Sequence, residues 1–184
     1  MSDSQVIFRK ATLPDVPELM ALIACASRAL SAADYSNTQI EAAIGTVWGV
    51  DEELIRDQTF IVATILQDEV EKIVGCGGWS KRAKLFGASE GNESSPLLDP
   101  QNDASRIRAF FVHPEWSRQG IGREIIRICE HEARQAGFTK MELMATLPGY
   151  RLYRSCGYLG DEITPCGSNE FNTHDCVPMW KSLI

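Results

Sequence analysis

The sequence predicts a mixed α/β fold, and three observations lead to this prediction. Short apolar runs typical of β-strands alternate with stretches of helical periodicity along nearly the whole chain, which is the pattern of helices packed on a sheet. The 184 residues are 44% hydrophobic and 23% charged, as in ordinary globular proteins. A chain of this length buries about 70% of its unfolded surface, enough for one core. We therefore expect residues 1–184 to form a single domain.

The first elements follow from local signals. Residues 6–10 predict a strand, and a helix is expected to begin at Thr12, with Pro14 near its first turn, and to run to about Ala29. Shorter helices are expected at 37–43 and about 52–56.

A hairpin is expected next. The β-branched run at 60–64 and the apolar run at 72–79 predict its two strands, joined through 67–69. The second strand contains Gly75, Gly77 and Gly78. Glycines inside a strand are typical of a bulge or of close approach by a ligand.

The middle of the chain predicts a long loop and a strand. Residues 87–103 are rich in Gly, Ser, Pro, Asn and Asp, which favours a loop; whether 87–105 is ordered does not follow from the sequence. The strand at 106–112 alternates in polarity. A regular strand would place Ile107, Ala109 and Phe111 on one face, and Arg108, Phe110 and Val112 on the other.

The last third of the chain continues the alternation. Apolar residues at helical spacing follow Gly120 as far as Ala136, and Gly137 is the natural stop of that helix. A strand at 140–145, a short helix at 149–156 and a final strand near 177–180 complete the prediction.

Charge and hydropathy exclude several classes of function. With 18 Lys and Arg against 25 Asp and Glu, the net charge is −7, which argues against binding a nucleic acid through its phosphates. No run approaches the ~20 apolar residues that span a bilayer, and the first residues lack the features of a signal peptide. We expect a cytoplasmic protein with no membrane or nucleic-acid partner.

The six cysteines predict reduced thiols. They form no C-x-x-C pair, so the spacing of a structural metal site is missing and no metal is expected. The tightest polar group is His174, Asp175 and Cys176, with Cys166 ten residues before Cys176. We interpret this group as a polar loop before the final strand.

The stretch 111–123 carries the clearest chemical signal. It combines the end of a strand, a loop and a helix whose first turn holds Gly120 and Gly122. The first turn of a helix leaves N–H groups unpaired, and glycines let an anion approach them. Arg118 and Arg123 could each add a charge-assisted hydrogen bond to a phosphate. A dinucleotide fold is disfavoured, because the third glycine of its motif is replaced by Ile125.

These residues resemble a known family. Val-His-Pro at 112–114, Trp-Ser-Arg-Gln-Gly-Ile-Gly at 116–122 and Leu-Tyr-Arg-Ser-Cys-Gly-Tyr at 152–158 are similar to motifs of the general-control-related N-acetyltransferase (GNAT) superfamily. The resemblance implies a central mixed, mostly antiparallel sheet flanked by helices. This sheet would splay open between the strands at 106–112 and 140–145, and acetyl-CoA would enter the wedge as cosubstrate.

The resemblance also assigns residues to cofactor binding. Backbone N–H groups near Val112 would hold the pantetheine and the thioester carbonyl, and the loop at 117–122 would hold the pyrophosphate. Ser117 and Thr146 depart from the family pattern, which usually has Arg or Gln at the first position and Asn at the second. The implied cofactor-binding residues are Phe111, Val112, His113, Arg118, Gln119, Gly120, Ile121, Gly122, Arg123 and Thr146.

The family position of a catalytic tyrosine is matched by Tyr153. A phenol with an unperturbed pKa of about 10 is protonated at neutral pH and can donate a proton to the departing thiolate. The alternatives are that Tyr153 is a packing aromatic, or that Tyr150, one turn earlier, has the role. The base that takes the proton of the amine stays open between His113, Glu115, Glu142 and water.

The acceptor site is expected between the first helices, the strand that ends at Trp79 and the long loop. Trp48, Phe110 and Trp79 are candidate walls, although Trp48 and Phe110 could equally be core residues. The acidic side chains of the loop could attract a cationic amine, or could simply be solvated. These side chains are Glu90, Glu93, Asp99 and Asp103.

The resemblance therefore implies an N-acetyltransferase that moves acetyl from acetyl-CoA directly to a primary amine. The net charge of −7 favours a small-molecule amine over a protein amine. Two alternatives remain: a non-catalytic acetyl-CoA sensor or regulatory module, and a generic nucleotide-binding protein. Pairing as a homodimer is a further expectation from the resemblance.

Overall fold

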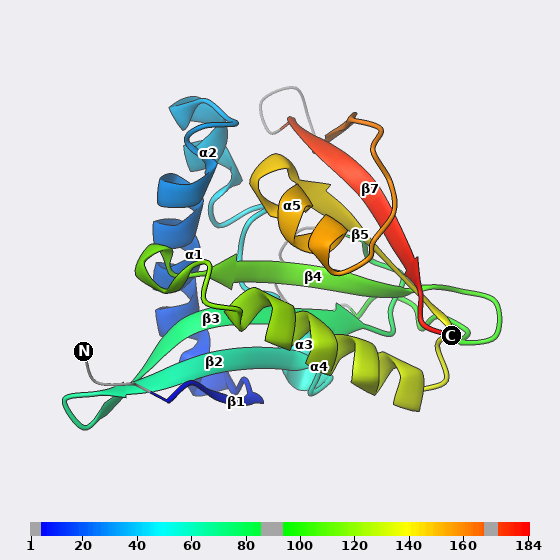
Figure 1. The fold of residues 1–184 in the computed structure, drawn as a ribbon, viewed down its shortest axis with the longest axis horizontal. Coiled ribbons are helices and arrows are strands. Elements are labelled where there is room, and N and C mark those ends of the chain that lie inside the picture. Colours follow the sequence, from blue (N-terminus) through cyan, green and yellow to red (C-terminus); the bar gives the residue numbers. More distant parts are fainter. Residues whose placement is uncertain (1–4, 86–93, 168–172) are drawn as a thin grey trace.

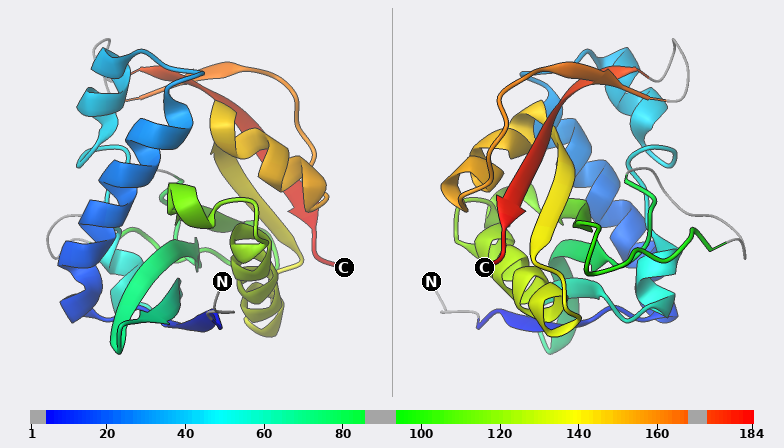
Figure 2. Two further views of the ribbon diagram at one scale, coloured as in Figure 1. Left: turned by 60° about the vertical axis from the view of Figure 1, so that its left-hand side comes forward. Right: turned by 90° about the vertical axis from the view of Figure 1, so that its right-hand side faces the viewer.

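A computed structural model describes residues 5–85, 94–167 and 173–184. Seven strands form one sheet in the order β1-β2-β3-β4-β5-β7-β6, with helices on both faces (Figures 1 and 2). All neighbouring strands pair antiparallel except β4 and β5. The prediction of a mixed, mostly antiparallel sheet flanked by helices is confirmed.

The N-terminal half matches the predicted order. Asp68 and Glu69 join the hairpin of β2 and β3, both with positive φ (51° and 63°), as a two-residue hairpin turn matched to the strand twist requires. The bounds are β1 (Ile7–Lys10), η1 (Leu13–Asp15), α1 (Val16–Ser31), α2 (Asn37–Ala43), α3 (Glu52–Arg56), β2 (Phe60–Gln67) and β3 (Val70–Ser80).

The C-terminal half adds one strand that the sequence did not predict. The strand β6 is only three residues long and contains Pro165, which an edge strand tolerates because the missing N–H faces away from the sheet. The bounds are β4 (Ser105–Val112), η2 (Pro114–Trp116), α4 (Ile121–Gln135), β5 (Lys140–Thr146), α5 (Leu147–Ser155), β6 (Thr164–Cys166) and β7 (His174–Ser182).

Two apolar clusters cover the two faces of the sheet. One gathers residues of α1, α2 and α3 against β2 and β3. The other packs α4 and α5 against β2, β4, β5 and β7. The helices α1 and α4 accordingly lie on opposite sides of the sheet (Figure 2).

The sheet opens between β4 and β5. The two strands pair only through Ser105 with Met141 and Arg106 with Glu142. Beyond this point β5 continues along β7 as far as Thr146, whereas β4 stays with β3 as far as Val112. The strands therefore diverge, as Figure 1 shows, and the splay expected between 106–112 and 140–145 is confirmed.

A β-bulge in β4 overturns part of the predicted alternation. Gly78 pairs with Arg108 and Cys76 with Phe111, so two residues of β4 lie opposite Gly77 alone. Ala109 takes a φ of 57° at this point. The extra residue moves Phe110 and Val112 to the face of Ile107, while Ala109 and Phe111 face the other cluster. Bulges of this kind re-aim side chains, often beside active sites.

The ion pair at the start of α1 gives a pH-dependent contribution to stability. The guanidinium of Arg9 contacts both carboxylate oxygens of Asp15 at 2.8 and 2.9 Å, and these bonds lower the pKa of Asp15 to about 2. A lowered pKa stabilises the fold at every pH above the unfolded value, and the gain is lost as the pH falls toward 2.

We therefore expect Asp15→Asn to lower the unfolding free energy by about 1–2 kcal/mol at pH 7, after allowance for the partial exposure of Arg9. Urea unfolding at about pH 7 and about pH 3 measures the difference, which should shrink at the lower pH. The exposed Asp34 provides a matched control, Asp34→Asn. A loss that is independent of pH, or equal in the control, would contradict this account.

Candidate active site

The turn before α4 presents unpaired backbone donors. The N-cap Gly120 has a φ of 89° and Arg118 a φ of 64°, and the first backbone bond into the helix runs from the N–H of Glu124 to the carbonyl of Gly120 (3.0 Å). The N–H groups of Ile121, Gly122 and Arg123 therefore precede the helical ladder and are available to a ligand. Together with the positive end of the helix dipole, they suit a phosphate.

The two glycines of this turn have different reasons to be glycine. A Cβ on Gly122 would lie 2.9 Å from Cδ2 of Leu152, so this glycine allows α4 to pack against α5. A Cβ on Gly120 would meet nothing within 4 Å, so here the requirement comes from the left-handed backbone. The sequence suggested that both glycines let an anion approach the backbone. In the structure, the close approach at Gly122 is that of Leu152 on α5, and the turn itself depends on Gly120.

The side chains of the turn differ in how they are held. Arg118 and Arg123 are exposed, and Nη2 of Arg123 lies 3.5 Å from Oγ of Ser155. Arg118 makes no ion pair within the described part of the chain. The amide of Gln119 donates to the carbonyl of Glu115 (3.1 Å). Both guanidinium groups can therefore turn toward an anion at the start of α4.

The open edge of β4 offers a backbone donor to the wedge. The N–H of His113 donates to the carbonyl of Val74 on β3 (2.8 Å). Because backbone groups point to alternate edges along a strand, the N–H of Val112 points the other way, toward the wedge between β4 and β5. An oxyanion or a thioester carbonyl in the wedge could accept this hydrogen bond.

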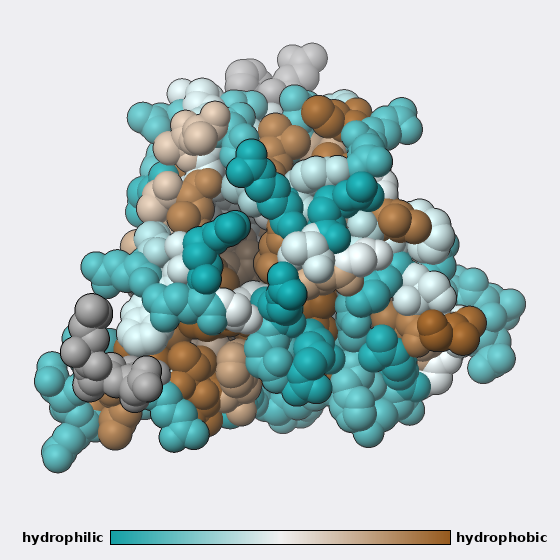
Figure 3. All heavy atoms as spheres, in the orientation of Figure 1, coloured by the Kyte–Doolittle hydropathy of each residue, from teal (hydrophilic) through white to brown (hydrophobic). Residues whose placement is uncertain are grey.

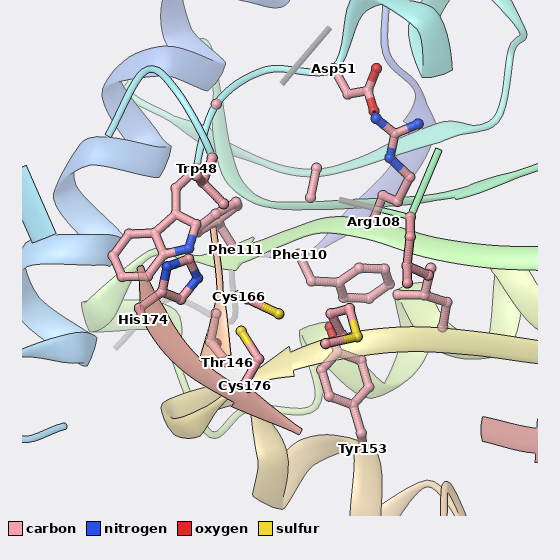
Figure 4. Close-up of a pocket in the computed structure, with 16 residues that line it drawn as sticks. Trp48, Asp51, Arg108, Phe110, Phe111, Thr146, Tyr153, Cys166, His174 and Cys176 are labelled. Atoms are coloured by element: carbon pink, nitrogen blue, oxygen red, sulfur yellow. Dashed lines mark ion pairs between the residues drawn. The ribbon is translucent and has the colours of Figure 1, made fainter. Parts of the chain in front are cut away.

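A pocket lies beside the bulge (Figure 4). The surface in Figure 3 is hollowed near its centre, over the region where Figure 1 shows β4 and α5. The wall is built from the α2–α3 connection, β4, β5, α5, β6 and β7. Its lining residues are Val47, Trp48, Gly49, Asp51, Leu85, Ile107, Arg108, Ala109, Phe110, Phe111, Met144, Thr146, Tyr153, Cys166, His174 and Cys176.

Tyr153 lies on the pocket wall. Its ring packs edge-on against Phe110 and Tyr158, with ring centroids 6.0 and 5.9 Å apart, and Figure 4 shows it rising from α5 toward Phe110. Burial raises the pKa of Tyr153 above its usual value, and the Cys129 and Cys156 thiols add to the shift. The side chain is thus a packing aromatic whose hydroxyl keeps its proton at the pocket.

Tyr150 and Thr146, the other residues expected near the thiol of CoA, differ in their position relative to the pocket. The hydroxyl of Tyr150 is hydrogen-bonded to Asp161, and Tyr150 is not among the residues that line the pocket. Thr146 is the N-cap of α5 and does line the pocket. The geometry therefore favours Tyr153 over Tyr150 as the donor.

The three candidate bases lie outside the pocket lining. Glu142 is ion-paired with Arg106. His113 accepts a hydrogen bond at Nδ1 from the N–H of Glu115 (3.3 Å), and its Nε2 lies 3.8 Å from Sγ of Cys25. Direct contact of these side chains with a molecule in the pocket is not supported by this arrangement.

A buried ionic cluster at one end of the pocket was missed by sequence reasoning. Arg108 forms an ion pair with Asp51 and contacts Glu53 at 3.4 Å, and all three side chains are buried. Glu53 also accepts bonds from the N–H and Oγ of Ser95 at 2.8 and 2.9 Å. Arg82 supplies a second cation, with Nε 3.8 Å from Glu53, so the charges are matched locally, as buried charges must be. Arg108 lies more than 50 positions from both acids, and no spacing signal links it to them.

Two of the three candidate wall residues line this pocket, and the third does not. Trp48 and Phe110 line the pocket. Trp79 does not: it is buried in the core, where Nε1 donates to Glu132 (2.8 Å) and the ring contacts Phe138. Its residue type suggested a binding wall, but its position on β3 turns it toward α4.

His174 was expected in a polar loop and instead begins β7, buried on the pocket wall. Its ring packs edge-on against Trp48 and Tyr35, with centroids 5.3 and 5.7 Å apart. Cys166 and Cys176 line the pocket beside it. The register of β6 and β7 brings these residues together, and β6 is the strand that the sequence did not predict.

Of the four acidic side chains that could attract a cationic amine, the structure describes two. Glu90 and Glu93 lie outside the described residues. Asp99 accepts bonds from Gln101 and Asn102, and Asp103 accepts one from the N–H of Asp99 (2.8 Å). Both of these carboxylates stabilise a local turn.

All six cysteines are free thiols. Within residues 5–85, 94–167 and 173–184, no three His, Cys, Asp or Glu side chains group in a way that could hold a metal ion. Over the same ranges, no helix has the length and apolar character needed to cross a membrane.

Comparison with known proteins gives a consistent family. The model of the acetyltransferase (GNAT) family matches residues 28–158. Among proteins with curated descriptions, none matches the sequence significantly.

Solved structures share the fold. A GCN5-related N-acetyltransferase from Rhodopseudomonas palustris superposes with a TM-score of 0.68 at 21% identity, covering 99% of this chain and 98% of that one. The PaiA N-acetyltransferase from Thermoplasma acidophilum, in complex with coenzyme A, gives 0.62 at 14% identity, covering 97% and 99%. The yncA protein from Salmonella typhimurium, with its cofactor acetyl-CoA, gives 0.62 at 16% identity, covering 98% and 95%.

Proposed function

The chain belongs to the acetyltransferase (GNAT) family, and from this premise we propose that it transfers an acetyl group from acetyl-CoA directly to the primary amine of a small molecule. Acetyl-CoA is the cosubstrate, in keeping with the family and with the coenzyme in two related structures. One observation carries the proposal furthest. The pocket lined by Tyr153 lies at the bulge of β4, beside the wedge that exposes the Val112 N–H.

Each part of the site has a role in this reaction. The N–H groups at 121–123 hold the pyrophosphate of acetyl-CoA, assisted by Arg118 and Arg123. The Val112 N–H donates to the thioester oxygen, which becomes negative as the amine nitrogen attacks the carbonyl carbon. A preorganised donor of this kind is worth about 2.7 to 4 kcal/mol in well-studied enzymes. The C–N bond forms, the C–S bond breaks, and the sulfur receives a proton from Tyr153, which regains one from water.

The proton of the attacking amine goes to water. Direct transfer to His113, Glu115 or Glu142 is not supported, since none of them lines the pocket. A free amine is mostly protonated at neutral pH, and the aromatic walls around Trp48 and Phe110 disfavour the charged form of a bound amine. A low-dielectric pocket therefore helps to release the proton before attack.

A small acceptor suits the shape of the pocket. Trp48, with His174 and Cys176 of β7, forms one wall of the pocket, and the cavity volume is about 100 Å³. That space holds a small group, not a folded protein surface. The net charge of −7 also suits a cationic small molecule in free solution.

Two experiments test this function: thermal unfolding in the presence of candidate cofactors, and then release of CoA with a panel of amines. Acetyl-CoA at 100 times its dissociation constant should add about 2.7 kcal/mol, a rise of roughly 5 to 11 °C for a domain of this size. We expect acetyl-CoA and CoA to shift the midpoint and NAD and ATP not to do so. Release of CoA with small amines, exceeding that with peptide amines, supports the proposal. Tight acetyl-CoA binding with no CoA release across the panel would indicate a sensor instead.

A further inference from the structure

The indole N–H of Trp48 is a buried donor on the pocket wall. Trp48 is 5% exposed and lines the pocket. Over the described residues its Nε1 has no hydrogen-bond partner. Figure 4 shows the indole beside the imidazole of His174, at the end of the pocket away from Tyr153.

An unsatisfied buried donor is costly, so its position needs a reason. Leaving such a group without a partner is unfavourable, and most buried indole N–H groups are paired. Trp79 of the same chain follows the rule, because its Nε1 donates to Glu132 at 2.8 Å. Trp48 differs in that its environment includes the pocket, where a bound molecule could supply the missing acceptor atom.

The neighbours of Trp48 restrict the chemistry of that atom. The rings of Tyr35 and His174 pack against the indole at 5.6 and 5.3 Å between centroids. The cation of the pocket lining, Arg108, is already ion-paired with Asp51 and contacts Glu53. A carboxylate buried beside Trp48 would therefore find no matching guanidinium. It would need a positive charge on the buried imidazole of His174, and burying further charge is expensive. An uncharged oxygen accepts the bond without that cost.

We propose that Trp48 donates a hydrogen bond from Nε1 to an uncharged oxygen of the acceptor, which makes the acceptor a small primary amine that also carries an ether, hydroxyl or carbonyl oxygen. This inference rests on the proposed function in one respect, because it takes the pocket to be the acceptor site. The amine end lies toward Tyr153 and the oxygen end toward Trp48. Trp48 is then a specificity-determining residue for this reaction.

Indole N–H resonances observed by NMR on the CoA-loaded protein test the hydrogen bond directly. The probes are 3-methoxypropylamine and pentylamine, which have the same length and differ by an oxygen in place of a methylene. We expect the ether to move the Trp48 resonance downfield and pentylamine to leave it nearly in place. The Trp79 resonance, already bonded to Glu132, is the internal control. Trp48→Phe assigns the signal.

Steady-state kinetics test the consequence for specificity. We expect the protein to prefer 3-methoxypropylamine over pentylamine by about 5- to 10-fold in kcat/KM, the value of one neutral hydrogen bond. In Trp48→Phe this preference should fall to near unity. The same substitution at the half-exposed Trp180, outside the pocket lining, should keep it.

Three results would overturn the inference. The first is a Trp48 resonance that neither amine moves, or that both move equally. The second is a preference that survives in Trp48→Phe. The third is a larger preference for β-alanine, whose carboxylate would replace the uncharged oxygen. Loss of the proposed function has a different signature, because the thermal shift with acetyl-CoA or the release of CoA would then be missing.

Discussion

Gly120→Glu is expected to remove measurable acetyl-CoA binding, a loss of at least about 100-fold in affinity. The substitution puts a carboxylate at the N-cap of α4, where the unpaired N–H groups would otherwise receive a pyrophosphate. Two like unit charges about 4 Å apart repel by about 4 kcal/mol at an effective dielectric of about 20. The φ of 89° adds strain, since a non-glycine residue in the left-handed region costs about 1–2 kcal/mol.

The opposite end of the same helix supplies a matched control. Gly137 follows α4 with a φ of 93°, and a Cβ there would make only an ordinary contact with Pro100 at 3.5 Å. Gly137→Glu therefore introduces the same charge and similar strain away from the turn. We expect it to lower the unfolding midpoint and to retain the shift with acetyl-CoA. Calorimetric titration of both variants distinguishes the effects, and equal losses of affinity would contradict a pyrophosphate site at Gly120.

Elements with a strong local signal could be predicted from the sequence. The helix α4 follows from its apolar spacing and from the glycine at each end, and its expected stop at Gly137 lies two residues beyond Gln135. The hairpin of β2 and β3 follows from a β-branched run and an apolar run on either side of a short polar turn. In these cases the information lies within a few consecutive residues.

The pocket could not be predicted in the same way, because long-range pairing builds it. The bulge at Ala109 depends on Gly77 lying opposite. The alternating polarity of residues 106–112 does not indicate it. Asp51 and His174 reach the site only through the contact with Arg108 and the pairing of β6 with β7. A three-residue strand with a proline leaves almost no periodic signal.

Tyr153→Phe is expected to lower kcat by about 100-fold while acetyl-CoA binding is retained. The variant keeps the ring contacts with Phe110 and Tyr158 and removes only the hydroxyl. General acids contribute about 10²- to 10⁴-fold, and the lower end applies here. Burial raises the pKa of Tyr153, and a phenol with a raised pKa is a weaker acid toward the departing thiolate than an ordinary one.

The control lies on the same helix. The Tyr150 hydroxyl is bonded to Asp161 outside the pocket lining, so the Tyr150→Phe variant should turn over at the wild-type rate.

The pH profile of kcat adds an independent readout. Because burial disfavours the phenolate, Tyr153 keeps its proton above the usual tyrosine pKa of about 10. We expect kcat to show no alkaline loss up to about pH 10. A fall in kcat near pH 10 that disappears in Tyr153→Phe would mean that the phenol ionises in its ordinary range. Unchanged turnover in Tyr153→Phe would leave the thiolate to take its proton from water.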